Sequence, residues 1–188
     1  GGGVCLFDVD GDGDLDLYCP GGGVFDKSSG AAVGVAGKLF RNNGECRFTN
    51  ITAESGLSNP TDYSHGAVAG DYDRDGDLDL FVLCFGHSRL FRNDSGVFAD
   101  VTESAGLMSQ SWDTAAVFAD VTGDGWPDLF CVQDAPLLPS SEKPPSNRLY
   151  RNKGNGTFED VTESAGLIRS GYGQGVAVGD YDNDGYDD

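Results

Sequence analysis

The sequence is poor in basic residues, in histidine and in long apolar runs, and each shortage argues against a class of function. Its 188 residues include 12 Lys and Arg against 31 Asp and Glu, a formal net charge of −19, which argues against binding to nucleic acid phosphates. Two histidines leave little imidazole for acid–base catalysis. No apolar run approaches the roughly 18 residues of a membrane span. The abundant acids therefore carry most of the information.

One nine-residue phrase, Asp-x-Asp-x-Asp-Gly-x-x-Asp, organises these acids. It reads DVDGDGDLD from Asp8, DYDRDGDLD from Asp71, DVTGDGWPD from Asp120 and DYDNDGYDD from Asp180. The four loops hold 18 of the 31 acids. Alternating carboxylates around a Gly turn supply the hard oxygen ligands that Ca²⁺ requires, and like charges this close repel strongly without a cation. The loops predict up to four Ca²⁺ sites, the alternative being solvated polar hairpins.

The predicted ligands are the side chains at loop positions one, three, five and nine and the backbone carbonyl at position seven. They are Asp8, Asp10, Asp12, Asp14 and Asp16; Asp71, Asp73, Asp75, Asp77 and Asp79; Asp120, Thr122, Asp124, Trp126 and Asp128; and Asp180, Asp182, Asp184, Tyr186 and Asp188. The Gly at position six suits a sharp bend with positive φ. Thr122 replaces a carboxylate, so the third loop is expected to be the weakest complete site, because ligand charge tunes Ca²⁺ affinity.

Other metals and an EF-hand fit the loops less well. An EF-hand needs a bidentate Glu at position twelve and flanking helices, whereas position twelve is Cys19, Val82 or Cys131 and the flanks are strand-like. Mg²⁺ remains an alternative, although it prefers strict octahedral geometry. Zn²⁺ would favour Cys and His ligands. Four bound Ca²⁺ would change the charge from −19 to −19 + 8 = −11, which is still acidic.

A longer repeat surrounds each loop. A small apolar strand comes first (GVCLF, GAVAG, AAVFA, GVAVG), and a second strand follows the loop (LDLYC, LDLFVLC, PDLFCV). Then come KLFRNNG, RLFRNDSG or RLYRNKGNG, the fourth strand RFTNIT, VFADVT or TFEDVT, and the turn AESGL or ESAGL. Loop spacings are 63, 49 and 60 residues. Four short antiparallel strands per repeat predict an all-β fold of β-propeller blades; a β-solenoid has shorter repeats and parallel strands.

These motifs, DxDxDGxxDL followed by LFRNxGxxFxDVTxxAGL, resemble the FG-GAP/VCBS repeat family, whose best-known propellers are those of integrin α subunits. The phrase FxDVTxxAGL is most similar to the cartilage acidic protein and ASPIC/UnbV group of secreted proteins. The resemblance covers essentially the whole chain and implies a seven-bladed propeller with Ca²⁺ loops between the first and second strands of its blades. The chain departs from the pattern at Thr122, Asn50 and Ile51, and the ASPIC/UnbV segment is not present.

The repeats divide residues 1–188 into units of about 1–57, 58–107, 108–167 and an incomplete 168–188. Three full repeats and a beginning fall short of the four to eight blades of a propeller. The sequence also has neither an initiator Met nor a signal peptide. We therefore expect a piece of a larger propeller, with the fourth loop at the end of the chain.

The five cysteines do not form a metal pattern. Cys5, Cys19 and Cys131 stand where other repeats have Val or Ala, which predicts small buried apolar residues. A disulfide that involves Cys46, Cys84 and another cysteine remains open, because spacing alone cannot pair them.

The (F/Y)RN phrase of the third strand repeats an arginine. Arg41, Arg92 and Arg151 are expected to be structural, forming ion pairs or capping backbone carbonyls within or between blades.

Three Asn-x-Ser/Thr triplets begin at Asn50, Asn93 and Asn155 and match the glycosylation pattern.

The chemistry favours a non-catalytic, calcium-stabilised extracellular module for protein recognition or adhesion. Extracellular modules bind Ca²⁺ with a Kd of about 10⁻⁴–10⁻³ M, so we expect a secreted or cell-surface location, periplasmic or on the outer surface in a bacterium. A lectin-like carbohydrate-binding propeller is the alternative. A loop-borne hydrolase site is a third hypothesis, for which only His65 and His87 are available as imidazole bases.

Strand direction places the other connections on the face opposite the Ca²⁺ loops. That face should carry Tyr63, His65, His87, Trp112, Asp113, Tyr172, Gln174 and the insertions 20–38 and 132–148. Aromatic and polar loop residues on a rigid scaffold are a usual place for binding, although Trp112 and Tyr172 can instead pack between blades. We expect a protein or glycan ligand on this face, with no nucleic acid and no membrane span.

Overall fold

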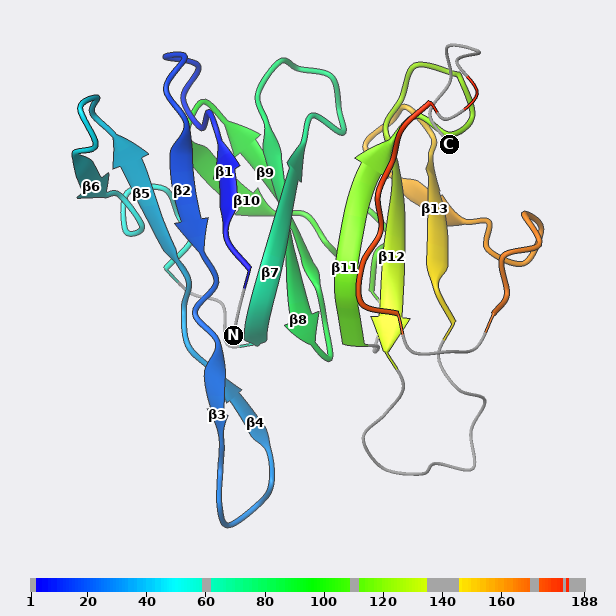
Figure 1. Cartoon of the computed structure of the whole chain (residues 1–188), viewed down its shortest axis with the longest axis horizontal. Coiled ribbons are helices and arrows are strands. Elements are labelled where there is room, and N and C mark those ends of the chain that lie inside the picture. Colours follow the sequence, from blue (N-terminus) through cyan, green and yellow to red (C-terminus); the bar gives the residue numbers. More distant parts are fainter. Residues whose placement is uncertain are drawn as a thin grey trace.

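The computed structural model describes residues 3–58, 62–108, 112–134, 146–169, 173–180 and 182. Throughout these residues the chain forms strands and turns and no helix (Figure 1). Within the same ranges, no helix is therefore long and apolar enough to cross a membrane. Twelve of the fourteen described strands group into three units of four, which we call blades 1 to 3.

Each blade consists of antiparallel strands that pair in sequence order. Blade 1 contains β1 (Cys5–Phe7), β2 (Asp16–Cys19), β5 (Lys38–Asn42) and β6 (Phe48–Asn50). Blade 2 contains β7 (Tyr63–Gly70), β8 (Asp79–Phe85), β9 (Arg89–Asp94) and β10 (Val97–Asp100). Blade 3 contains β11 (Trp112–Ala119), β12 (Asp128–Asp134), β13 (Arg148–Asn152) and β14 (Phe158–Asp160). The predicted all-β fold of four-stranded propeller blades is confirmed.

The first strands of neighbouring blades, β1, β7 and β11, lie next to one another (Figure 1). Gly3 N–H donates to the His65 carbonyl at 2.7 Å. A Cβ placed on Gly70 would lie 2.6 Å from the Phe118 ring of the next blade, closer than side chains pack. The small residues of the first strands are therefore a requirement of close approach between blades.

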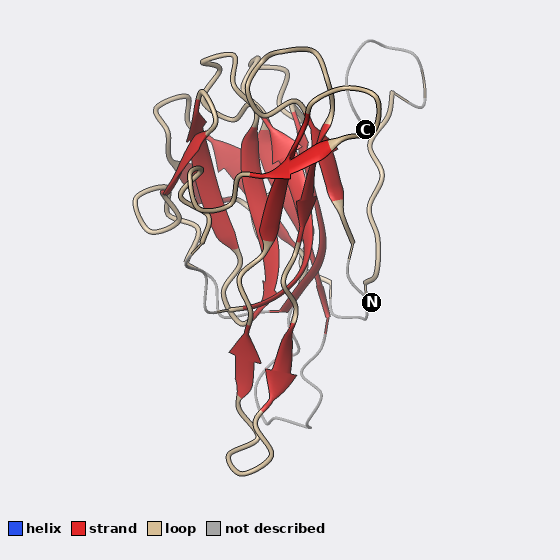
Figure 2. Cartoon of the chain, turned by 90° about the vertical axis from the view of Figure 1, so that its left-hand side faces the viewer, coloured by secondary structure: helices blue, strands red, loops and turns tan. Residues whose placement is uncertain are grey.

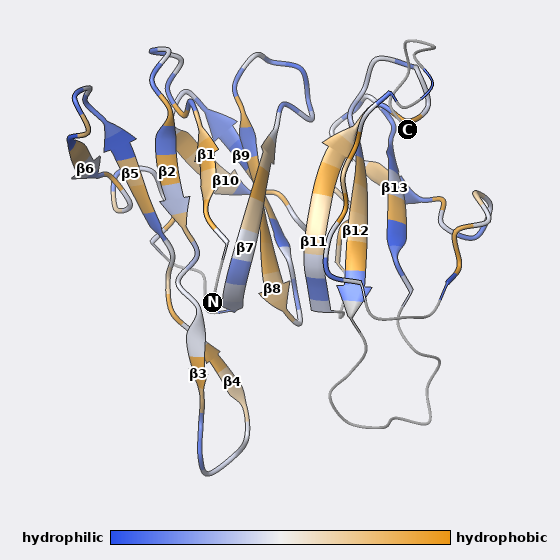
Figure 3. Ribbon diagram, viewed as in Figure 1, coloured by the Kyte–Doolittle hydropathy of each residue, from blue (hydrophilic) through white to orange (hydrophobic). Residues whose placement is uncertain are grey.

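The hydrophobic core lies between blades rather than within them. One cluster joins blades 1 and 2 through Phe7, Leu39, Leu80 and Phe91 among others, and a second joins blades 2 and 3. The second consists of Tyr72, Phe81, Leu83, Leu90, Ala105, Leu107, Leu129, Cys131, Tyr150 and Phe158. Figure 3 shows apolar residues along β8, β11 and β12 and polar residues in the loops at the top. Each blade therefore depends on its neighbour to bury its apolar face.

The turns that end the first two repeats bind the following blade. The Ser55 carbonyl accepts a hydrogen bond from Phe98 N–H at 2.8 Å, and the Ala105 carbonyl accepts one from Phe158 N–H at 2.9 Å. Gly56 has φ +83°, and a Cβ there would lie 2.8 Å from the Phe98 carbonyl oxygen. The recurrent Gly-Leu of the turn thus follows from a positive φ and a close contact.

The Asp-Val-Thr phrase of blades 2 and 3 lies at the outer edge of the blade. Thr102 Oγ1 donates to Asp100 Oδ1 at 2.6 Å, and Arg89 donates to Asp100 Oδ2 at 2.7 Å. Although burial raises the pKa of Asp100, hydrogen bonds from Thr102 and Arg89 more than offset this and hold it below its ordinary value. In blade 1, Asn50 keeps the bond from Thr52 at 2.6 Å but is neutral. Asn50 therefore retains the hydrogen bond from the threonine but cannot form the ion pair that Asp100 forms with Arg89.

Two features of the fold differ from the sequence prediction. The insertion after β2 contains an additional hairpin of β3 (Gly23–Phe25) and β4 (Ala32–Gly34), which projects beyond the blades (Figure 2). The expected first strand at 175–179 is described but is not a strand. A strand requires a hydrogen-bonded neighbour, and within the described ranges no second strand follows to pair with these residues.

All five cysteines are free. Cys5, Cys84 and Cys131 are buried, Cys19 is half-buried and Cys46 is exposed. Burial raises the pKa of Cys5 to about 11 and that of Cys84 to about 12, as expected for inert packing thiols. The prediction of buried apolar roles is confirmed for Cys5 and Cys131, and the structure does not contain the disulfide that the sequence left open.

Candidate metal centre

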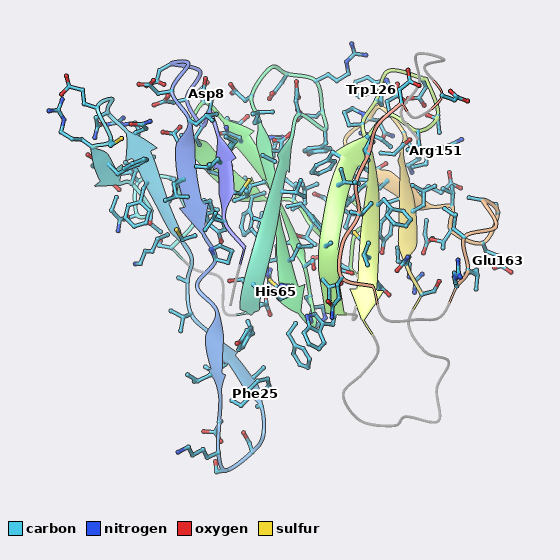
Figure 4. The ribbon with its side chains drawn as sticks, in the orientation of Figure 1. Asp8, Phe25, His65, Trp126, Arg151 and Glu163 are labelled. Carbon is cyan, nitrogen blue, oxygen red and sulfur yellow. The ribbon has the colours of Figure 1, made fainter. Side chains whose placement is uncertain are left out.

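The first three Asp-rich loops lie at the same end of the blades, each between the first and second strand (Figures 1 and 4). Gly13, Gly76 and Gly125 have φ angles of 89°, 98° and 88°, so the predicted positive φ at position six is confirmed. Position four also has positive φ, at Gly11 (75°), Arg74 (58°) and Gly123 (70°). The bend at position four is not evident from the sequence, because the second loop has Arg74 where the first and third have glycine.

The position-one aspartate holds the loop closed from inside. Asp8 Oδ1 accepts from Gly11 N–H at 2.8 Å, and its Oδ2 accepts from Gly13 N–H at 2.9 Å. The second bond recurs as Asp71–Gly76 at 3.1 Å and Asp120–Gly125 at 2.7 Å. The bond from the position-six N–H is therefore common to the three described loops, whereas the other oxygen of the position-one carboxylate accepts from position four in the first loop and from position five in the second and third.

The position-nine aspartate begins the second strand and is buried in every described loop. Asp16 and Asp79 are each 0% exposed, and Asp128 is 1% exposed. Asp79 Oδ2 accepts from Tyr72 N–H at 3.0 Å, and its Oδ1 accepts from Asn93 N–H at 2.9 Å. One carboxylate therefore ties the Asp-rich loop to the third strand of its own blade.

Carboxylates converge in the first two loops. Oxygens of Asp8, Asp10 and Asp16 lie within 4.8 Å of one another, and so do oxygens of the corresponding Asp71, Asp73 and Asp79. The third loop lies wholly within the described residues and has no such group, because Thr122 stands where the others place the position-three aspartate. Thr122 Oγ1 instead lies 3.4 Å from Asp120 Oδ1.

The chemistry of these donors fits a hard cation. Asp73 Oδ1 and Asp128 Oδ2 are buried acceptors with no hydrogen-bond partner in the described structure. Burial raises the pKa of Asp79 to about 7, and it also raises the pKa values of Asp16, Asp73 and Asp128. Buried carboxylates with free lone pairs are compensated by protons or by metal coordination, and Ca²⁺ accepts such oxygen sets.

The remaining predicted ligands take distinct positions. Asp12 Oδ1 accepts from Asp14 N–H at 2.8 Å and so lies at the exposed rim of its loop. Asp77 Oδ2 accepts from Ser95 N–H at 2.7 Å, so the position-seven side chain is engaged by the β9–β10 turn, as expected if only its carbonyl faces an ion. Asp75 and Asp124 repeat the rim bond of Asp12. In the fourth loop Asp180 and Asp182 are exposed, whereas Asp184, Tyr186 and Asp188 lie outside the described residues.

The repeated arginines form ion pairs at the surface. Arg41 lies 3.9 Å from Asp10, Arg92 lies 2.9 Å from Asp94, and Arg151 lies 3.3 Å from Glu159. The expected structural ion pairs are therefore present, although partly exposed pairs of this kind contribute only about 0–1 kcal/mol.

The face opposite the loops carries an aromatic group (Figure 4). The rings of Phe85 and Trp112 have centroids 5.5 Å apart, and Phe25 lies 5.7 Å from Tyr63. Trp112 Nε1–H donates to His65 Nε2 at 3.0 Å, so this imidazole is neutral and accepts at Nε2. Burial lowers the pKa of His65. Trp112 thus packs between blades 2 and 3, the alternative that the sequence left open.

The other residues expected on this face are dispersed. Asp113 is only 2% exposed and accepts from Ser88 at 2.6 Å and from Gln133 at 3.0 Å, so it is an interior contact and its expected place on the ligand face is wrong. His87 is half-buried and Gln174 is exposed. Tyr172 and residues 135–145 of the second insertion lie outside the described residues.

Comparison with known proteins identifies the repeat. The model of the FG-GAP-like repeat family matches residues 8–82, 71–131 and 137–188. Mouse cartilage acidic protein 1 is 28% identical over 97% of this chain and 29% of its own length. The human protein of the same name is 28% identical over 78% of this chain and 23% of its own length. The chain thus spans less than a third of these relatives.

A solved structure is similar at lower identity. It belongs to an Agrocybe aegerita lectin described as recognising non-reducing terminal N-acetylglucosamine. The two chains are 22% identical with a TM-score of 0.41, and the match covers 82% of this chain and 36% of the lectin.

The His65–Trp112 bond predicts a pH dependence of stability. Because burial lowers the folded pKa of His65, the unfolded chain takes up the proton first as the pH falls below about 6.5. The contribution of His65 to the free energy of unfolding should therefore fall as the pH drops from 7 to 5, whereas the carboxylates whose pKa values burial raises contribute the opposite change. Urea titrations of both proteins isolate the His65 contribution: relative to His65→Gln, which keeps an acceptor but does not titrate, the unmutated protein should lose stability over this range. A difference in stability between the two proteins that does not change with pH would contradict the assignment.

Proposed function

The chain belongs to the FG-GAP-like repeat family, and we propose that it is a non-catalytic, calcium-stabilised β-propeller module of the cell exterior that recognises another protein. The observation that supports Ca²⁺ binding best is the convergence of carboxylates on a buried position-nine aspartate in the first two loops. Desolvation raises the pKa of that aspartate, and a divalent cation would compensate the charges that the fold brings together.

The position-one, -three, -five and -nine side chains would hold the ion together with the position-seven carbonyl. When bound, Ca²⁺ would supply positive charge that lets neighbouring carboxylates remain ionised. At about 1 mM Ca²⁺ and a Kd of about 10⁻⁴–10⁻³ M, each site would stabilise the fold by about 0.4–1.4 kcal/mol. Cytosolic Ca²⁺ is far lower, so this mechanism suits a secreted or cell-surface protein.

The hairpin β3–β4 supports a recognition role at the opposite face. Val24, Phe25, Val33 and Val35 are 62%, 53%, 49% and 52% exposed, an unusual set of apolar side chains for one projecting hairpin. Phe25 also contacts Tyr63 and Phe85, so the hairpin continues into the aromatic group of the blades. Apolar and aromatic residues of this kind are enriched at the centres of protein interfaces.

Removal of Ca²⁺ should lower the melting temperature of the protein, and addition of Ca²⁺ should restore it. Asp75→Ala should reproduce most of one site's share, about 0.4–1.4 kcal/mol, because it removes a charged ligand from the exposed rim without disturbing the core. Calorimetric melting with and without chelator measures both effects. Glu163→Ala, an exposed acid outside the loops, is the charge-matched control. A melting curve unchanged after verified metal removal would refute the calcium proposal.

In a Ca²⁺ titration, the third loop should bind its ion at a higher Ca²⁺ concentration than the first and second loops. It has three ligand carboxylates, from Asp120, Asp124 and Asp128, where the other loops have four, so its attraction to the cation is weaker. In a chain labelled with ¹⁵N-glycine, the amide signals of Gly13, Gly76 and Gly125 should follow the three loops separately during a Ca²⁺ titration. Thr122→Asp should move the Gly125 transition to the Ca²⁺ concentration of its neighbours. If the third loop filled first, ligand charge would not rank these sites.

Replacement of Phe25 by Ser should weaken adhesion of the Ca²⁺-loaded protein to cells of its source organism. Leu6→Ser is the control, because Leu6 is a comparably exposed apolar residue at 58% outside the hairpin. Protease treatment of the cells should abolish binding if the ligand is a protein, whereas loss of binding only after periodate oxidation would favour the lectin alternative. Equal adhesion by Phe25→Ser and the unmutated protein would exclude the hairpin as the contact surface.

A further inference from the structure

A buried asparagine connects the first Asp-rich loop to the second, and another connects the second to the third. In Asn152 the two hydrogens of the side-chain amide point to different blades: Nδ2 donates to the Tyr72 carbonyl of the second loop at 2.8 Å and to the Pro127 carbonyl of the third loop at 3.0 Å. Asn93 does the same one blade earlier, with the Val9 carbonyl at 3.0 Å and the Leu78 carbonyl at 3.1 Å. Thus the two described junctions between loops have the same bridge.

Each bridging asparagine is fully engaged and fixed in place. Asn93 is 0% and Asn152 1% exposed. The backbone N–H of Asn152 donates to Asp128 Oδ1 at 2.7 Å, and its Oδ1 accepts from Gly154 N–H at 3.0 Å. A side chain with every polar group satisfied in the interior is held in one orientation. Burial also makes Asn93 unsuitable as a glycan acceptor, despite its Asn-x-Ser triplet.

The side chain of Asn152 contacts the second loop at Tyr72, the residue between two predicted ligands. Tyr72 lies between Asp71 and Asp73; its carbonyl binds Asn152, while its N–H binds Asp79 Oδ2 at 3.0 Å. These two hydrogen bonds hold the backbone N–H and carbonyl of Tyr72. They therefore also hold the adjoining residues, whose carboxylates are the predicted ligands at positions one and three. The same asparagine holds the position-nine carboxylate of the third loop through its backbone. One residue therefore contacts the ligand framework of two sites.

A second contact links the same two loops at the surface. The Arg74 guanidinium of the second loop lies 5.4 Å from the centre of the Trp126 ring of the third loop. Trp126 occupies position seven, whose carbonyl is a predicted ligand, and a Cβ on Gly154 would lie 2.8 Å from its ring. Loop two, loop three and the β13–β14 turn therefore pack as one unit.

We infer that Asn93 and Asn152 are positioning residues that couple neighbouring metal sites, so that an ion in one loop strengthens binding in the next. This inference rests on the proposed function of the loops. An ion in the second loop would hold the backbone around Tyr72 more tightly, and the Asn152 bridge, which joins Tyr72 to the Asp128 carboxylate, would extend this restriction to the third loop. The third loop then loses less conformational freedom when it binds. Linkage makes the effect reciprocal.

The first test disables the second loop without touching the bridge. Asp75 is exposed and its side chain bonds only within its own loop among the described residues, so Asp75→Ala should leave Asn152 in place. In the full chain labelled with ¹⁵N-glycine, the Ca²⁺ midpoint of the Gly125 amide should rise about five-fold or more. Because Asp75→Ala leaves the core unchanged, a shift of the Gly125 midpoint would report coupling between the second and third loops.

The second test removes the bridge. In Asn152→Ala the additional change Asp75→Ala should shift the Gly125 midpoint by less than about two-fold, because the contact that transmits the effect is gone. Asn155→Ala is the matched control: Asn155 is an exposed asparagine in the same β13–β14 turn that bonds to Thr157, and it should keep the full shift.

The outcomes separate the two proposals. If Ca²⁺ moves all three glycine amides but the Gly125 midpoint is the same with and without Asp75→Ala, the sites are independent and the coupling is refuted while calcium binding stands. If Asn152→Ala retains the five-fold shift, the bridge is not the transmitter. If no glycine amide responds to Ca²⁺, the proposed function fails and the coupling fails with it.

Discussion

The structure depends on a buried carboxylate at the start of every second strand. Asp16, Asp79 and Asp128 are almost completely enclosed, yet each lies beside other acids of its loop. Burial of a charge is unfavourable unless it is paired and hydrogen-bonded. The fold meets this requirement in part by directing backbone N–H groups of the third strand, from Asn42, Asn93 and Asn152, to these aspartates. One oxygen of Asp128 has no hydrogen-bond partner in the described structure, and burial raises the pKa of Asp79; both features fit a site that a cation would complete.

This constraint also explains the organisation of the blades. A blade with an apolar face on each side cannot bury both faces alone, and both described cores lie between blades. The buried aspartate and the asparagine that contacts it extend the same principle to polar groups, since Asn93 and Asn152 reach the loop of the preceding blade. Neighbouring blades therefore share both their apolar core and the contacts that hold their loops. At the two described junctions, an asparagine side chain joins one loop directly to the next.

Much of this could be predicted from sequence because the determinants are local and repeated. The loop phrase fixed the glycine bend, and the alternation of apolar strands with Gly and Asn turns fixed the blade order. Other features depend on contacts between distant residues. Trp112 and Asp113 are adjacent in sequence, yet one contacts His65 and Phe85 while the other is enclosed by Ser88 and Gln133. The hairpin β3–β4 was missed because a glycine-rich insertion has no strand periodicity. The bridging asparagines belong to the (F/Y)RN phrase, but their contacts join residues about 80 positions apart, so the phrase alone does not predict them.

The central claim, that a divalent cation completes the compensation of these buried aspartates, is tested most directly by anomalous diffraction from crystals grown with Ca²⁺. The account predicts an anomalous peak inside each of the first three loops, within Ca²⁺–oxygen bonding distance, about 2.3–2.6 Å, of the position-nine carboxylate and the position-seven carbonyl. The third loop should show the lowest occupancy at limiting Ca²⁺. Loops that hold only water at saturating Ca²⁺, with ions bound elsewhere on the acidic surface, would contradict it.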